Sequence, residues 1–138
     1  MAFHSFAAGR KLIRALEKRS QPICCGEGCI LFSQGDQPRG LYILKTGEAL
    51  LIMNSASGHM IMCHRVFAGS VLGLSGVIGN EPHTLGAIAR GGSKVGFVSR
   101  LDFEDLIREY PSLQPNLLEI LASDVRGARQ AFFEHSTG

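Results

Sequence analysis

The sequence lacks a long apolar run and a secretory signal. No stretch of its 138 residues approaches the ~20 apolar residues that a membrane-spanning helix requires. Residues 1–9 also lack the apolar segment of a secretory signal. We therefore expect a cytoplasmic protein that does not insert into a membrane.

The sequence also lacks a strong excess of charge of one sign. Lysine and arginine number 14 and aspartate and glutamate number 12, which gives a formal net charge of +2. Dedicated nucleic-acid-binding domains are usually far more basic, because they neutralise phosphates. The composition therefore gives no indication of DNA binding, and we expect no nucleic-acid contact by this chain alone.

Cysteine is sparse. Four cysteines in 138 residues do not make the short, cysteine-dense chain that is typical of a secreted disulfide scaffold. We therefore expect reduced thiols at Cys24, Cys25, Cys29 and Cys63. A redox role for the adjacent Cys24 and Cys25 is kept as an alternative.

The sequence contains no arrangement of residues that is typical of an enzyme. A Gly-x-Ser-x-Gly elbow, a pair of catalytic carboxylates and a Ser, His and Asp arrangement are all missing. His59, Cys63 and His64 have the chemistry of metal ligands, but on a strand four residues advance about 13 Å and adjacent residues point to opposite faces. We therefore expect neither catalysis nor a metal site, and the sequence identifies no cofactor.

What the sequence does contain is a regular succession of short apolar runs. Its length and its 45% hydrophobic content suit one domain with one core, covering residues 1–138 without a linker or an internal repeat. Turn-forming residues separate six runs that predict short strands, namely Cys29–Phe32, Leu41–Leu44, Ala49–Met53, Met60–Val66, Thr84–Ala89 and Val95–Val98. This spacing predicts an antiparallel sandwich or roll over about residues 23–98.

Helical periodicity flanks these runs. Apolar residues at helical spacing predict a surface helix over Phe6–Arg19, which Pro22 would end. Ser99 begins a sequence with capping-box-like spacing, and the apolar residues after it predict a short helix that stops before Pro111. A longer helix is predicted to run to about Phe133. The C-terminal helices thus occupy about residues 99–134 of an α+β architecture.

The last predicted helix has more apolar surface than one contact with a small roll requires. One face consists of residues at spacings of four, four, three and four, namely Leu117, Leu121, Val125, Ala128 and Phe132. Other faces carry further apolar residues, which would stay exposed in a monomer. We therefore expect a homodimer that forms through this C-terminal helix.

Several of these stretches also share a specific family pattern. Ile30–Asp36, Gly40–Leu44 and Thr46–Glu48 resemble the opening strands of the cyclic-nucleotide-binding domains of the CRP/FNR superfamily of transcription regulators. The resemblance continues through Gly69–Leu74 and Val95–Phe103 and covers nearly the whole chain. It implies a β-roll of the double-stranded β-helix or jelly-roll type. An N-terminal helix, a short helix after the roll and a long C-terminal dimerisation helix complete the implied fold.

The resemblance also implies what to expect outside the roll. In these regulators a winged helix-turn-helix follows the long helix, whereas this sequence stops at Gly138. We therefore expect either a solitary sensor domain or a fragment of a DNA-binding regulator. Oxygen-sensing members hold an iron–sulfur cluster through N-terminal cysteines, but the spacing of Cys24, Cys25 and Cys29 does not match that motif.

The resemblance places a ligand pocket at residues 73–84, where two charged anchors are missing. In the family a glutamate binds the ribose hydroxyl and an arginine binds the cyclic phosphate, whereas the matching residues here are Leu74 and His83. A histidine with a pKa of about 6.5 is mostly uncharged at neutral pH. If each lost contact costs ~1.5 to 3 kcal/mol, cyclic AMP or cyclic GMP would bind roughly two to four powers of ten more weakly.

A glycine-rich turn with two hydroxyl side chains is still present at this position. An anion or another small molecule can bind such a turn, here at the expected pocket residues Gly73, Leu74, Ser75, Gly76, His83 and Thr84. The alternative is a structural turn in a roll that has lost its ligand. We therefore hypothesise a non-enzymatic regulatory module that senses a ligand of unknown identity. The other hypotheses are a ligand-free dimerisation or interaction scaffold, and the sensor fragment of a DNA-binding transcription regulator.

Overall fold

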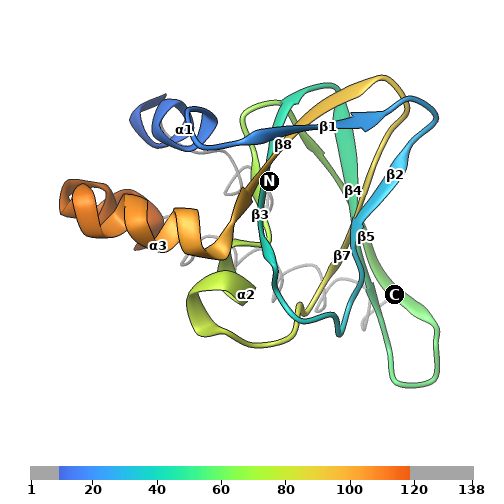
Figure 1. The fold of residues 1–138 in the computed structure, drawn as a ribbon. Coiled ribbons are helices and arrows are strands. Elements are labelled where there is room, and N and C mark those ends of the chain that lie inside the picture. The colour runs from blue at the N-terminus through green and yellow to red at the C-terminus, as the bar shows by residue number, and fades with distance from the viewer. Residues whose placement is uncertain (1–9, 119–138) are drawn as a thin grey trace.

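The fold is an antiparallel β-roll with helices packed on one side. The computed structural model describes residues 10–118 of the chain. Eight strands in this part of the chain form two four-stranded antiparallel sheets, in the orders β1-β8-β3-β6 and β2-β7-β4-β5. The strands are β1 (Gln21–Cys25), β2 (Cys29–Phe32), β3 (Gly40–Thr46), β4 (Glu48–Asn54), β5 (Met60–Phe67), β6 (Val71–Leu72), β7 (Gly86–Ala89) and β8 (Ser93–Ser99). The β-roll expected from the sequence is confirmed (Figure 1).

Two strands of the roll escaped the sequence prediction. β1 contains Pro22, which from the sequence alone indicates only the end of a helix. Proline is tolerated there because β1 lies at the edge of its sheet, where one side of the strand needs no backbone donor. β6 has two residues and is too short to show any periodicity. The six predicted strands all form, with ends shifted by up to two residues.

The chain crosses between the two sheets by short turns at one end of the roll and by longer segments at the other. Residues 26–28, 47, 68–70 and 90–92 make the four short crossings. The strand register places them together, because Cys25 pairs with Ser93, Glu48 with Phe67, and Ala49 with Ala89. The two longer crossings, residues 33–39 and 73–85, lie at the opposite end. One end of the roll is therefore tightly connected and the other carries long loops.

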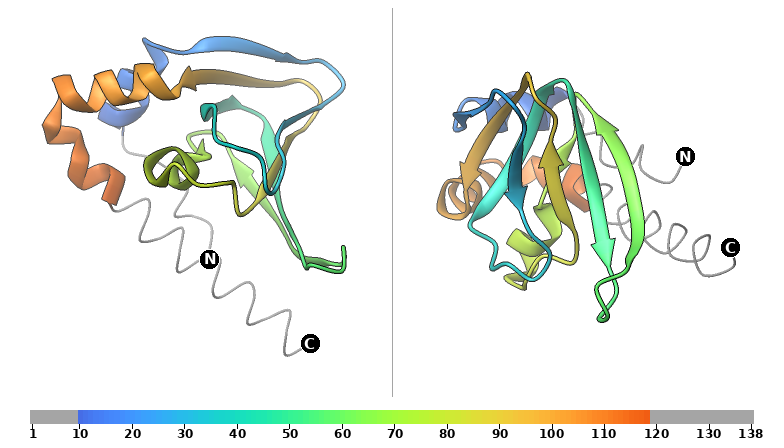
Figure 2. Two further views of the ribbon diagram at one scale, coloured as in Figure 1. Left: turned by 60° about the horizontal axis from the view of Figure 1, so that its bottom comes forward. Right: turned by 90° about the vertical axis from the view of Figure 1, so that its right-hand side faces the viewer.

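The helices lie together on the outer face of the sheet that contains β3 and β8. α1 (Arg10–Glu17) and α3 (Arg100–Glu109) run side by side there, and the shorter α2 (Leu74–Gly79) lies below them (Figures 1 and 2). α3 begins as predicted, because the Ser99 hydroxyl oxygen accepts a hydrogen bond from the backbone N–H of Asp102 at 3.1 Å. Within residues 10–118, none of the helices combines the length and the apolar character that crossing a bilayer requires.

After α3 comes the one-turn 3-10 helix η2 (Pro111–Leu113), and residues 114–118 are helical. Leu117 of the predicted dimer helix is buried among the other helices. Its other predicted residues, Leu121, Val125, Ala128 and Phe132, lie outside the described residues.

Strand alternation divides the apolar side chains into two clusters. On β3, Tyr42 and Leu44 point into the roll, whereas Leu41 and Ile43 point to the helices. The inner cluster fills the roll and consists mainly of Leu31, Phe32, Leu44, Leu51, Met62, Val66, Leu72 and Val95. The outer cluster joins the sheet to the helices and consists mainly of Leu12, Leu16, Leu41, Ile43, Leu74, Val77, Val98, Phe103, Leu106, Leu113 and Leu117. β3 therefore separates the roll interior from the helices.

One expectation about cysteine is wrong. Cys25 and Cys29 form a disulfide, because β1 ends at the first and β2 begins at the second. The three-residue turn between them brings their Cα atoms to 5.3 Å, a usual separation for a disulfide. Cys24 and Cys63 are free and exposed, which agrees with the reduced thiols expected at these two positions.

Candidate functional site

α2 and the loop after it form the segment where the sequence predicted a pocket. Gly73 precedes α2 with a φ of 85°, a conformation that glycine adopts without strain. Asn80 ends the helix with a φ of 50°, and the chain then returns to the roll at His83. The segment therefore lies across the loop-rich end of the roll.

The structure gives the six predicted pocket residues different surroundings. Gly73, Ser75, His83 and Thr84 line a cavity of about 20 Å³ where α2 meets the roll. Leu74 is 3% exposed and packs in the outer cluster, away from that cavity. Gly76 lies against the ring of His83. A cavity of this size holds about one water molecule and no small-molecule ligand.

His83 is the reason why this cavity is small. Its side chain is buried, with 6% of the residue exposed, and its ring stacks on Phe32 with 4.0 Å between ring centroids and 24° between planes. On its other side the imidazole touches the backbone of α2. A Cβ atom added to Gly76 would lie 2.9 Å from its Nδ1, and one added to Gly73 would lie 3.2 Å from its Cε1. The imidazole thus fills the space between the roll and α2.

Burial lowers the pKa of His83, and the opposing effect of the Asp36 carboxylate does not cancel it. The imidazole is therefore neutral at pH 7 and does not supply the cation that an arginine would bring to a phosphate. Its backbone is also fixed to the loop before β3. The His83 N–H donates to the Asp36 carbonyl at 2.9 Å, and the Gly35 N–H donates to the His83 carbonyl at 2.7 Å.

The lowered pKa of His83 predicts a loss of stability at mildly acidic pH. As the pH falls below about 6.5, the unfolded chain binds the proton before the folded one does. The free energy of unfolding should therefore have its full value above this pH. It should decrease as the pH falls from there toward the lower pKa of the folded state. Urea denaturation at several pH values, for the wild type and His83→Gln, measures this. We expect a shallower pH dependence for the variant, and equal slopes would contradict the prediction.

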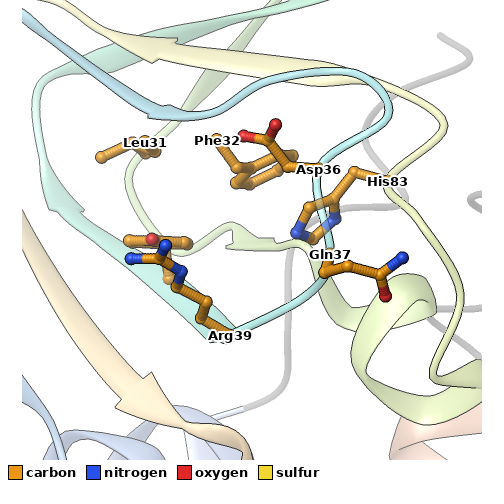
Figure 3. Close-up of a pocket in the computed structure, with 7 residues that line it drawn as sticks. Leu31, Phe32, Asp36, Gln37, Arg39 and His83 are labelled. Carbon is orange, nitrogen blue, oxygen red and sulfur yellow. The ribbon is translucent and has the colours of Figure 1, made fainter.

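A larger cavity lies on the other side of the Phe32 and His83 rings. Its volume is about 350 Å³, and it is lined by Leu31, Phe32, Asp36, Gln37, Arg39, Tyr42 and His83 (Figure 3). Six of these seven residues were not among the predicted pocket residues. The sequence signal that could have found them is the charged turn at Asp36 and Arg39, followed by the inward-facing Tyr42 of β3.

The electrostatics of this cavity arise from Asp36, Arg39 and Tyr42. Burial raises the pKa of Tyr42, the Arg39 guanidinium lowers it in part, and the Asp36 carboxylate raises it. The Tyr42 hydroxyl therefore stays protonated at neutral pH and can donate or accept a hydrogen bond. Asp36 and Arg39 line the cavity together with Tyr42, so both charges lie near this phenol.

Comparison with known proteins identifies the fold family. A family model described as the cyclic nucleotide-binding domain matches residues 24–110, well over half of the chain. The chain belongs to the cyclic nucleotide-binding domain family. The resemblance to cyclic-nucleotide-binding domains that the sequence indicated is thereby confirmed. No curated protein sequence matches the chain.

Solved structures share the fold of this cyclic nucleotide-binding domain. The catabolite activator protein of Thermus thermophilus is similar with a TM-score of 0.76 and 24% identity, over 98% of this chain and 62% of that protein. The N-terminal domain of a transcriptional regulator from Streptomyces coelicolor A3(2) gives 0.66 and 20%, over 95% and 92%. A cyclic nucleotide-binding-like protein from Brucella abortus gives 0.58 and 26%, over 77% and 89%. The chain spans less than two thirds of the Thermus protein.

The other candidate residues of this cyclic nucleotide-binding domain lie on β5 and in the hairpin tip before it. His59 lies in the β4–β5 hairpin tip, where its Nδ1 is 2.9 Å from the hydroxyl oxygen of Ser57. Cys63 is exposed, and Arg65 pairs with Glu48 at 3.3 Å on the outside of the roll. In the described range, no three His, Cys, Asp or Glu residues come together as ligands would.

Proposed function

We propose that this domain is a non-enzymatic ligand-sensing regulatory module that does not bind cyclic AMP or cyclic GMP tightly. The observation that carries the proposal is the position of His83. A buried, neutral imidazole occupies the space beside α2 and leaves a cavity of about 20 Å³ behind it. Family membership supports a regulatory sensor, whereas this packing argues against the usual ligand in the usual place.

A ligand in the roll would act on the helices through α2. Val77 and Leu74 of α2 pack in the same cluster as Phe103 of α3 and Leu117 of the following helical residues. A change in the position of α2 would therefore change the packing contacts of α3 and of the helical residues after it. Its effect is limited by the difference in ligand affinity between the two arrangements of the helices.

We also propose a homodimer through the C-terminal helix. Leu117 is 4% exposed and packs within its own chain, whereas Leu118 is 66% exposed. An apolar hollow of about 370 Å³ lies beside Leu118, with Ile78 and Ile107 among its lining residues. A second copy would cover the exposed side chains of Leu118 and Ile78 on this face.

Native mass spectrometry of the protein from its own host tests the proposal, because it shows subunit count and retained ligand together. We expect a dimer with a small molecule other than a cyclic nucleotide. A dimer that retains nothing, and that is unchanged by substitution of His83, would instead support a ligand-free dimerisation or interaction scaffold. A longer reading frame that encodes a DNA-binding domain would make this chain the sensor part of a transcription regulator.

A further inference from the structure

The mouth of the 350 Å³ cavity carries one carboxylate and one guanidinium. Asp36 and Arg39 are both exposed, and neither forms an ion pair with any other residue between 10 and 118. The two side chains lie on opposite sides of the hollow (Figure 3). One oxygen of Asp36 accepts a hydrogen bond from the Ser33 N–H at 3.0 Å, which fixes the carboxylate in place. A ligand with one anionic and one cationic group would satisfy both charges.

The walls of the cavity are aromatic. Phe32 lies between two rings: its centroid is 5.7 Å from that of Tyr42 and 4.0 Å from that of His83. Aromatic surfaces favour a planar ring in offset or edge contact. A volume of about 350 Å³ lies at the small end of the range for ligand pockets, ~300 to 1,000 Å³, and suits a molecule with one ring or two fused rings.

From this combination we propose that the cavity binds a small aromatic zwitterion of the size of an aromatic amino acid. Its anionic group lies at Arg39, its cationic group at Asp36, and its ring against Tyr42 and Phe32. The inference rests on the proposed sensory function and names the ligand class of the roll. It differs from a nucleotide phosphate site, because it uses the loop between β2 and β3 and leaves the residues of α2 outside the cavity.

The Arg39 side of the cavity is bonded directly to the helices. The Arg39 carbonyl accepts a hydrogen bond from the backbone N–H of Arg100, the first residue of α3, at 3.1 Å. The Arg100 side chain donates to the side-chain oxygen of Asn80, which ends α2, and pairs with Glu104 at 3.6 Å. A ligand that draws Arg39 inward therefore acts on a residue that joins the pocket loop, α2 and α3.

The Asp36 side is connected to α2 through His83, by hydrogen bonds on one side and by packing on the other. Backbone hydrogen bonds in both directions tie the turn at Gly35 and Asp36 to His83, whose ring touches the backbone of Gly73 and Gly76. Of the two residues that would hold the zwitterion, Arg39 is thus linked to a helix directly and Asp36 through one other residue. This arrangement gives the ligand a route to the helices that does not require the small cavity behind His83.

A titration followed by ¹H–¹⁵N NMR tests the ligand class with L-tryptophan and L-phenylalanine as probes. We expect both to shift the amide signals of Asp36, Arg39, His83 and Arg100. Tryptamine lacks the carboxylate and indole-3-propionate lacks the ammonium group, so each should bind at least about tenfold more weakly than L-tryptophan, as loss of one charged hydrogen bond predicts.

Two variants assign the charges. Arg39→Gln and Asp36→Asn should each weaken L-tryptophan about 10- to 100-fold. The asparagine retains an oxygen that accepts from Ser33, so the turn is preserved. Lys94→Gln and Glu27→Gln remove one exposed charge of each sign elsewhere and should leave the affinity unchanged. Dispersed spectra of all four variants confirm that they fold.

Two outcomes would overturn the ligand class. One is the absence of shifts at these four amides with both amino acids at millimolar concentration. The other is equal affinity for the zwitterion and its two singly charged analogues. Native mass spectrometry separates this failure from that of the sensory function. If the domain retains a different small molecule, only the ligand class is wrong. If it retains none and substitution of His83 has no effect, both proposals are wrong.

Discussion

Titration calorimetry with cyclic AMP should show binding roughly two to four powers of ten weaker than that of a domain with glutamate and arginine in the cassette. The reason is twofold. Leu74 and His83 supply neither a carboxylate for the ribose nor a cation for the phosphate. In addition, the space behind His83 is about 20 Å³, too small for a nucleotide without movement of α2. Sub-micromolar binding would contradict the pocket described above.

The double variant Leu74→Glu, His83→Arg separates these two causes. If charge alone were missing, restoring both residues would recover most of the affinity. We expect little recovery, because Leu74 packs in the outer cluster and the roll is filled around residue 83. The single variant His83→Ala is the matched control, because it enlarges the cavity without adding charge. Recovery of tight binding by the double variant would show that the backbone of the cassette is already in a nucleotide-binding arrangement.

The substitution Gly40→Ala should destabilise the fold by about 3 kcal/mol or more, at the upper end of the range for overpacking. An added Cβ atom would lie 2.2 Å from the carbonyl oxygen of Val98 and 2.7 Å from the ring of Phe97. The carbonyl belongs to β8, which pairs with β3 at this point, so relief requires a shift of the two strands. Urea denaturation followed by circular dichroism measures the change.

Gly26→Ala is the control for that substitution. No atom lies within 4 Å of a Cβ atom at Gly26, and its φ is not positive. A change of under ~1 kcal/mol is expected, and a gain in stability is consistent with the lower entropy of the unfolded chain. If Gly40→Ala were as stable as Gly26→Ala, the close approach of β3 and β8 would be wrong.

The sequence predicted the architecture better than the chemistry of the site. A short apolar run between turn-forming residues was enough to predict β3, and the cap at Ser99 was visible as a local motif. The large cavity was not visible, because it depends on how residues 33–39 lie against His83, a contact between segments about fifty residues apart. The disulfide was missed for a similar reason, since the turn that brings Cys25 to Cys29 follows a strand that Pro22 concealed.

Leu74 shows how packing within the chain bears on the predicted pocket. Alignment with the cassette placed it at the ligand, but it stands three residues before Val77 on a helix, so both lie on one face. That face packs against the helices in the outer cluster. Helical spacing within Gly73–Gly79 could therefore have indicated that the Leu74 side chain packs with Val77.

The uneven distribution of the crossings between the sheets constrains one end of the roll more closely than the other. Four short turns and the disulfide between Cys25 and Cys29 join the two sheets at one end. The 350 Å³ cavity lies at the other end, where the connections between the sheets are long. We expect a molecule held there to change the distance between the two sheets more at this end than at the end with the short turns. Since the Arg39 carbonyl accepts a hydrogen bond from the first residue of α3, this helix is attached to the end of the roll that holds the cavity.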